Sequence, residues 1–221
     1  SNGGSGSMSN QIANVPTALT LNTFTRTGYS FSGWNTAANG SGTAYANGAI
    51  YSFAADVTLY AQWTALPMHT VTFNSNGGSG SMSNQIANVP TALTLNTFTR
   101  AGYSFSGWNT ASNGSGTAYA NGATYSFAAD ITLYAQWTAL PMHTVTFNAN
   151  NGTGTMSPQT ANVPTALTLN TFTRTGYSFS GWNTASNGSG SAYANGATYD
   201  FSADITLYAQ WTALPMHTVT F

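Results

Sequence analysis

Few side chains in this sequence of 221 residues could serve in acid–base chemistry or hold a metal ion, and they recur at a fixed spacing of 74 residues. The histidines are His69, His143 and His217, and the chain contains no Lys, Glu or Cys. Because each stretch of 74 residues holds a single His, the three rings cannot converge on one metal ion unless the chain folds back on itself. We interpret each His as a polar residue at the start of a strand, and we expect no metal and no cofactor.

The carboxylates follow the same spacing, as Asp56, Asp130 and Asp204, and Asp200 is the only further acid. Calcium needs about 6–8 oxygen ligands, usually from several carboxylates, whereas a single Asp that follows two small residues is typical of a turn cap. We therefore expect each Asp to bond nearby backbone N–H groups. No paired carboxylates for glycoside hydrolysis recur in each copy, and no Ser–His–Asp set is arranged locally. No catalytic residue is assigned, and the chain is not expected to be an enzyme.

The cations are Arg26, Arg100 and Arg174, each placed before a Gly-Tyr pair. We interpret them as surface residues that stack on an aromatic ring or form an ion pair, with ligand recognition as the alternative. Charged residues make up 3% of the chain and the net charge is −1, so the clustered cations that nucleic acid requires are missing. A polybasic patch that could bind anionic lipid is missing as well. No apolar run approaches the roughly 20 residues of a membrane span, so this segment is not expected to enter a membrane.

Aromatic residues, at 14% of the chain, are the remaining candidates for binding. Under strict strand alternation Trp34 lies opposite Tyr29 and Phe31, and Tyr60 lies opposite Leu59 and Trp63. If one face of these strands is uncovered, such rings form an exposed strip that stacks on sugars; if both faces are covered, they build the core. The candidate sugar-stacking residues are Trp34, Tyr60, Trp108, Tyr134, Trp182 and Tyr208.

The elements that position these residues repeat three times along the chain. A fixed period is typical of an array of small domains, and nearly identical copies suit a function that depends on length and number. We predict modules at 1–68 (without its first strand), 69–142 and 143–216, with 217–221 as the first strand of a following module. Ile50 is replaced by Thr124 and Thr198, and Ile86 by Thr160, so we expect these positions at the surface.

Period-two alternation predicts a mainly β fold. No stretch has a helical period, and at most one helical turn fits within 9–15 or 22–28. The Asn47-Gly48 pair between two β-compatible runs predicts a hairpin with a type I′ turn. The linker 64–68 is short and contains Pro, which favours a semi-rigid, elongated array on the order of 90 Å long. The predicted strands are 18–21, 29–34, 57–63 and 69–73, and the hairpin arms are 43–46 and 49–53.

Three segments in each copy carry a resemblance to a known family. They are Val71-Thr72-Phe73-Asn74-x-Asn76-Gly77-Gly78, Arg-x-Gly-Tyr-x-Phe-x-Gly-Trp-Asn-Thr at 26–36 and Thr-Leu-Tyr-Ala-Gln-Trp at 58–63. The chain resembles the Listeria–Bacteroides repeat, the B-repeat of internalin-type bacterial surface proteins. The resemblance implies β-grasp-like modules in tandem on secreted or wall-attached bacterial proteins, where they act as stalk, fibre or adhesin shaft and carry no catalytic residues. The expected location is extracellular, on the cell surface or secreted. The expected partners are neighbouring repeats and a glycan or host-surface ligand.

Residues 217–221 repeat the strand at 69–73, and no copy of this strand precedes Ser1. One explanation is that the sequence is a window cut from a longer array. The other is strand donation, in which Val219 and Phe221 of one chain fill the first module of the next. Such head-to-tail contacts do not close on themselves, so this alternative predicts filaments.

Overall fold

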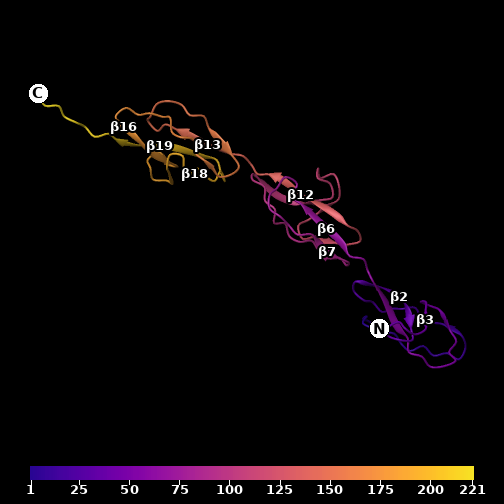
Figure 1. Ribbon diagram of the computed structural model, residues 1–221. Helices are drawn as coiled ribbons and strands as arrows, with labels where there is room; N and C mark the ends of the chain where they lie inside the picture. The colour runs from indigo at the N-terminus through magenta and orange to yellow at the C-terminus, as the bar shows by residue number, and fades with distance from the viewer. The chain divides into compact units, whose positions relative to one another are not determined.

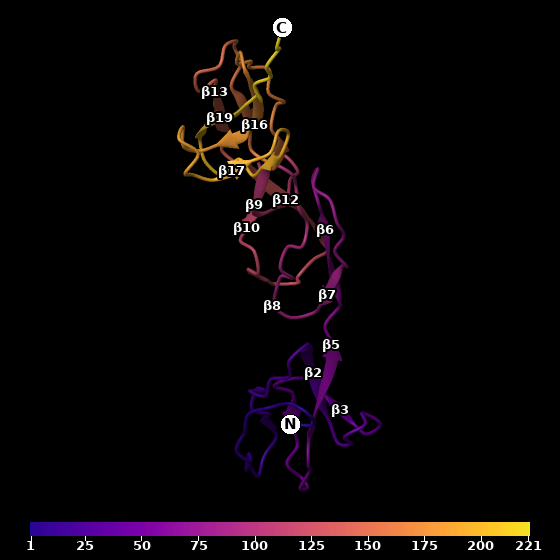
Figure 2. The same ribbon diagram turned by 90° about the vertical axis from the view of Figure 1, so that its left-hand side faces the viewer.

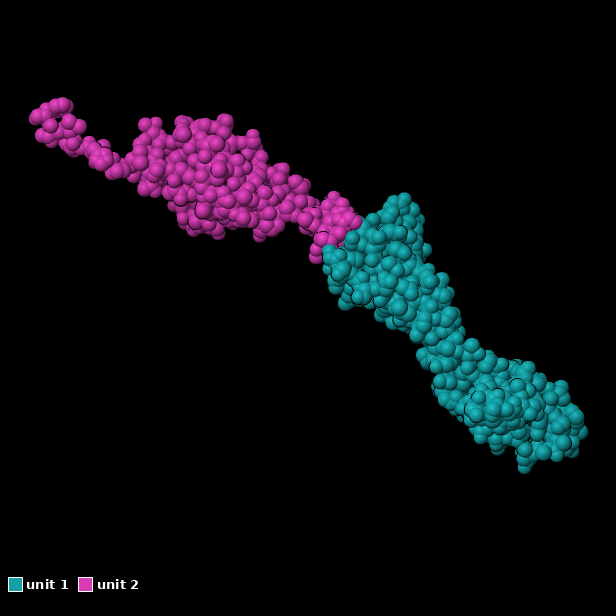
Figure 3. Space-filling view, in the orientation of Figure 1, with its two compact units in different colours: residues 1–76, 80–98, 107–136 teal, residues 77–79, 99–106, 137–221 magenta.

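The chain folds without helices, and every regular element in residues 1–221 of the computed structural model is a β-strand (Figure 1). No sheet combines strands from two copies of the repeat. Two compact units are coloured in Figure 3: residues 1–76, 80–98 and 107–136 form one, and residues 77–79, 99–106 and 137–221 form the other. The prediction of a mainly β tandem array with a separate sheet in each copy is therefore confirmed, while the individual module bounds stay predictions.

The main sheet of the second copy has two parallel strands at its centre. β6 (His69–Asn74) pairs with β12 (Ile131–Ala139), with Val71 opposite Ile131 and Phe73 opposite Leu133. β7 (Gln85–Ala87) pairs antiparallel with β6, and β9 (Tyr103–Asn109) lies between β12 and β10 (Ala118–Tyr119). A small separate ladder joins β8 (Thr91–Ala92) to β11 (Thr124–Tyr125). Thus the first and last strands of the copy, about sixty residues apart, lie side by side. No helix crosses the sheet, and the β-grasp classification stays a prediction.

The third copy repeats this arrangement, and its strands β13, β19 and β16 lie together in both views (Figures 1 and 2). The order is β14-β13-β19-β16-β17, with β13 and β19 parallel. The bounds are β13 (His143–Asn148), β14 (Gln159–Ala161), β15 (Thr165–Ala166), β16 (Tyr177–Asn183), β17 (Ala192–Tyr193), β18 (Thr198–Tyr199) and β19 (Ile205–Ala213).

The first copy forms a smaller sheet of β3 (Ala44–Tyr45), β2 (Tyr29–Asn35) and β5 (Tyr60–Ala65). Its last strand, β5, has no parallel neighbour and begins later in the copy than β12 and β19 do. The strand predicted at 18–21 is limited to β1 (Thr17–Ala18), which pairs with β4 (Ile50–Tyr51). Residues 217–221 form no strand, and both Val219 and Phe221 are exposed. Strand donation by this segment stays a prediction.

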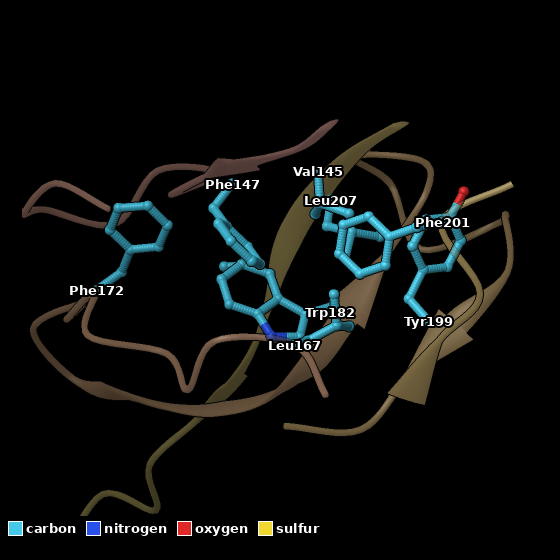
Figure 4. Close-up of a cluster of buried hydrophobic side chains, with 9 residues drawn as sticks. Val145, Phe147, Leu167, Phe172, Trp182, Tyr199, Phe201 and Leu207 are labelled. Carbon is cyan, nitrogen blue, oxygen red and sulfur yellow. The ribbon is translucent and has the colours of Figure 1, made fainter. Parts of the chain in front are cut away.

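Aromatic rings build the core of the third copy around Trp182, which is 1% exposed (Figure 4). The indole ring lies 4.9 Å from the ring of Phe147, 5.0 Å from Phe179 and 6.1 Å from Phe172, measured between centroids. Such tilted and edge-on contacts are favourable beyond the area that they bury. The other buried members are Val145, Leu167, Tyr199, Phe201, Leu207 and Ala209.

The prediction that Trp34 lies opposite Phe31 is wrong, and the reason is a β-bulge. Along the antiparallel pair β2–β5, Phe31 faces Trp63 but Gly33 faces Gln62, so the strand gains one residue between Phe31 and Gly33. An extra residue reverses the alternation that follows it. Trp34 therefore joins Phe31 on the inner face, with ring centroids 5.0 Å apart. The equivalent Trp108 and Trp182 are also buried.

The predicted Asn47-Gly48 hairpin is also wrong. A turn forms, with the Ala49 N–H donating to the Ala46 carbonyl over 3.1 Å. Gly48 has a φ of 73°, but Asn47 has no positive φ, so the type I′ geometry that favours hairpins is absent. The two arms separate, because β3 pairs with β2 while β4 pairs with β1.

The positions that accept both Ile and Thr lie at the surface, as predicted. Ile50 is 64% exposed and Ile86 is 61% exposed, and Thr124 and Thr160 are exposed as well. Since these side chains bury little area, a hydroxyl there keeps its contact with water.

Candidate functional site: the polar face of the complete sheet

The central parallel pair of each complete sheet has one apolar face and one polar face. Val71, Phe73 and Leu133 point into the core and are buried. Alternation places the neighbouring side chains on the opposite side, where a shallow hollow of about 380 Å³ is lined by Thr70, Thr72, Asp130, Ile131 and Thr132. We call the residues Thr70, Thr72, Asn74, Asp130, Thr132 and Tyr134 the polar face; its third-copy counterpart is Thr144, Thr146, Asn148, Asp204, Thr206 and Tyr208.

Asp130 holds the start of β6, and its partners are not the local ones predicted for a turn cap. Its Oδ1 accepts a hydrogen bond from the Thr70 N–H over 2.8 Å and lies 3.2 Å from Nδ1 of His69. In the third copy Asp204 contacts the Thr144 N–H over 2.7 Å and His143 over 3.3 Å. Each carboxylate therefore joins the last strand of its copy to the first, across about sixty residues of sequence.

These contacts place His69 and His143 at strand starts, each beside a single carboxylate. No three His, Cys, Asp or Glu side chains lie close enough together to hold a metal ion. His217 lies in the segment 217–221, outside any strand. The carboxylates of Asp130 and Asp204 are thus each paired with a histidine of the same copy.

The same contacts shift the acidity of the carboxyls. The hydrogen bond from the Thr70 N–H, followed by the one from His69, lowers the pKa of Asp130 below its ordinary value. For Asp204 the hydrogen bond from the Thr144 N–H is the largest cause that lowers the pKa, and desolvation opposes it. Both groups favour the carboxylate form in the folded chain.

A pH dependence of stability follows for the second copy. The folded pKa of Asp130 is lowered, so the folded state binds fewer protons than the unfolded state at acidic pH. The contribution of Asp130 to the free energy of unfolding is therefore complete above the unfolded pKa of about 3.9. It is lost as the pH falls through the folded pKa. We expect Asp130→Asn to lower the free energy of unfolding at neutral pH, and we expect the difference from the parent to shrink as the pH falls below about 3.9 toward about 2. Urea unfolding at both pH values measures this difference.

The matched control for this experiment is Asp56→Asn, because the first copy has no parallel neighbour beside β5. This variant should unfold like the parent at either pH. A stability difference for Asp130→Asn that stayed the same at both pH values would show that the carboxylate charge is not its cause.

The candidate sugar-stacking residues divide into two groups. Trp34, Trp108 and Trp182 are buried in the core and present no ring at the surface, which corrects the expected exposed strip. Tyr60, Tyr134 and Tyr208 are half-buried, and Tyr134 and Tyr208 belong to the polar face. A sugar-stacking role of these tyrosines stays a prediction.

Each arginine stacks on a tyrosine ring, as one of the two interpretations predicted. The guanidinium carbon of Arg26 lies 3.9 Å from the centroid of the Tyr29 ring, and the pairs Arg100–Tyr103 and Arg174–Tyr177 are spaced at 4.0 and 3.8 Å. Arg26 also packs on the tight turn at Gly3, where a Cβ would lie 3.6 Å from the guanidinium. The one cation of each copy is thus bound within its own fold.

A buried asparagine that the sequence analysis missed organises the Gly-rich loop of each copy. Asn183 is 3% exposed. Its amide N–H groups donate to the carbonyls of Gly188 and Gly190, and its Oδ1 accepts from the N–H groups of Ala185 and Gly190. The only sequence signal for this role was a loop whose backbone groups needed a partner. Asn35 and Asn109 make the same four contacts in their copies.

The structure contains no helix of the length and apolar character that a membrane-spanning helix requires. Comparison with known proteins identifies relatives among bacterial proteins. The chain is 41% identical over 157 residues to a Gly-rich protein named as a membrane protein of Evansella cellulosilytica, a match that covers 65% of this chain and 18% of the relative. A second protein of that organism, also named as a membrane protein, is 32% identical over 164 residues, or 72% of this chain and 24% of the relative.

Internalin H of Listeria monocytogenes is 35% identical over 132 residues, which cover 58% of this chain and 22% of the internalin. The chain therefore spans about a fifth of the length of these relatives. The model of the Listeria-Bacteroides repeat domain matches residues 1–62, 69–136 and 143–210, nearly all of the sequence. The chain belongs to the Listeria-Bacteroides repeat family.

Proposed function

We propose that these repeats form the stalk or adhesin shaft of a bacterial cell-surface protein, extracellular and without enzymatic activity. The observation that carries the proposal is that each copy has its own sheet, while the ionic side chains of the complete copies act within the fold. Asp130 and Asp204 bind their first strands, and each Arg stacks on its own Tyr. Such copies supply length and number rather than one reactive centre.

The relatives support the same proposal. They include an internalin and two proteins named as membrane proteins, each several times longer than the matched segment. With 3% charged residues, the chain also offers no charged patch for recognising a charged partner. A repeated module of this kind fits the part of a surface protein that separates a functional domain from its anchor.

Small-angle scattering of the 221-residue chain tests the proposed spacer. We expect an elongated particle with a maximum dimension on the order of 90 Å, and inserting one further copy of residues 69–142 should add about 30 Å. When two copies are inserted, each should increase the maximum dimension by the same amount. A compact profile whose maximum dimension hardly grows with added copies would contradict the proposal.

A second candidate function, multivalent carbohydrate binding, is favoured by one observation. Tyr134 lies on the polar face opposite Asn74, next to the Thr72–Thr132 pair, and the third copy repeats the arrangement with Tyr208 opposite Asn148. Half-buried tyrosine rings beside hydroxyl and amide groups suit neutral sugars, and several weak sites on one chain add through avidity. On a glycan array, Tyr134→Ala with Tyr208→Ala should abolish binding, while Tyr60→Ala in the incomplete first sheet should preserve it. Absence of any glycan signal from the parent chain would exclude this candidate.

A further inference from the structure

The contact between successive copies of the repeat depends on one asparagine side chain. Asn88 follows β7 in the second copy, and its amide nitrogen lies 3.2 Å from the Gly28 carbonyl and 3.2 Å from the Leu66 carbonyl, both in the first copy. The Leu66 N–H also donates to the Gly28 carbonyl over 2.9 Å. One amide therefore bonds both the turn before β2 and the start of the linker that joins the two copies.

The same contact recurs one period later, within the other compact unit. Asn162 donates to the Gly102 carbonyl over 3.1 Å and to the Leu140 carbonyl over 3.3 Å. The Leu140 N–H again donates to the glycine carbonyl, over 2.8 Å. Asn88 and Asn162, which we call the junction amides, are both half-buried, whereas the equivalent Asn14 of the first copy is exposed.

The glycine in the turn before β2 leaves space for the side chain of the junction amide. Gly28 has a φ of 77°, and a Cβ built there would lie 3.1 Å from Oδ1 of Asn88. At Gly102 the corresponding distance to Oδ1 of Asn162 is 2.9 Å. Gly176, with a φ of 76°, has no atom within 4 Å of its Cβ position. In every copy the glycine provides the positive φ that the turn requires. At Gly28 and Gly102 the missing Cβ also leaves room for the asparagine side chain of the following copy.

We infer that each junction amide restricts the rotation of its copy about the linker that joins it to the preceding copy. The linker between β5 and β6, residues 66–68, would rotate about several backbone bonds if it were free. The junction amide limits that motion because it bonds the linker and the preceding turn at the same time. The inference holds for a stalk and for a sugar-binding array alike, so the scattering and glycan experiments above do not decide it.

Distance measurements between spin labels test this inference directly. The chain has no cysteine, so Ala38→Cys and Ser112→Cys place labels at equivalent exposed positions of the first and second copies. We expect a narrow distance distribution in the parent chain and a clearly broader one in Asn88→Ala. Asn14→Ala is the matched control, since it removes the same side chain where no junction contact exists, and the distribution should stay as narrow as in the parent.

A second variant separates the loss of the hydrogen bonds from the loss of side-chain volume. Asn88→Asp keeps the shape of the side chain but turns an oxygen toward the Gly28 and Leu66 carbonyls, so it should broaden the distribution at least as much as the alanine variant. Circular dichroism identical to that of the parent would show that the copies themselves remain folded. Distributions of parental width in both Asn88 variants would overturn the inference.

Discussion

Trp182→Ala is expected to lower the free energy of unfolding of the third copy by about 3–5 kcal/mol, the cost usual for an aromatic residue removed from a core. Trp182 is 1% exposed, and aromatic rings surround it. Small domains are stable by only about 5–15 kcal/mol, so the variant should lose a large part of its native stability. The loss should be large because the indole packs against the rings of Phe147, Phe172 and Phe179, which would all lose a contact.

Urea unfolding followed by nuclear magnetic resonance separates the third copy from the other two and measures this loss. Leu169→Ala is the matched control: it removes an apolar side chain of the same copy that is 62% exposed. Its effect should remain within about 0.5 kcal/mol, as for most surface substitutions. A cost below about 1 kcal/mol for Trp182→Ala would show that this ring is not the centre of the core.

Asn183→Ala should destabilise the same copy by about 2–3 kcal/mol, because it leaves several partly buried backbone groups without their partner. The carbonyls of Gly188 and Gly190 lose a donor, and the N–H groups of Ala185 and Gly190 lose an acceptor. The Gly-rich loop would then have to find water for these groups or change its conformation. The free energy of unfolding and the amide exchange rates of the loop measure the effect.

Asn187 offers a control within the same loop. Its exposed side chain bonds only Ser189, two residues away, so Asn187→Ala should change the free energy of unfolding by less than about 0.5 kcal/mol. Asn183→Asp keeps both acceptor contacts but loses both donor contacts, and it should also be destabilising. If the two alanine variants were equally stable, Asn183 would not organise the loop.

Features that depend on local alternation or on repetition could be predicted from the sequence. The period of 74 residues, the β class and the inward Val71 and Phe73 all follow from patterns within a few residues or between identical copies. The stacking of Arg26 near Tyr29 was among these expectations, because its partner lies three residues away. The exposed Ile50 and Ile86 followed from their exchange with Thr.

The features that only the tertiary structure decided are contacts between residues that are distant in the sequence. A bulge opposite β5 turned Trp34 into the core, and pairing with two different strands separated β3 from β4. Asp130 found its partner at Thr70 rather than in its own turn, and Asn88 found its partners in the preceding copy. Local patterns specify which side chains prefer burial or a turn. They do not specify which strand supplies the opposing hydrogen bonds, because that choice depends on the packing of the whole copy.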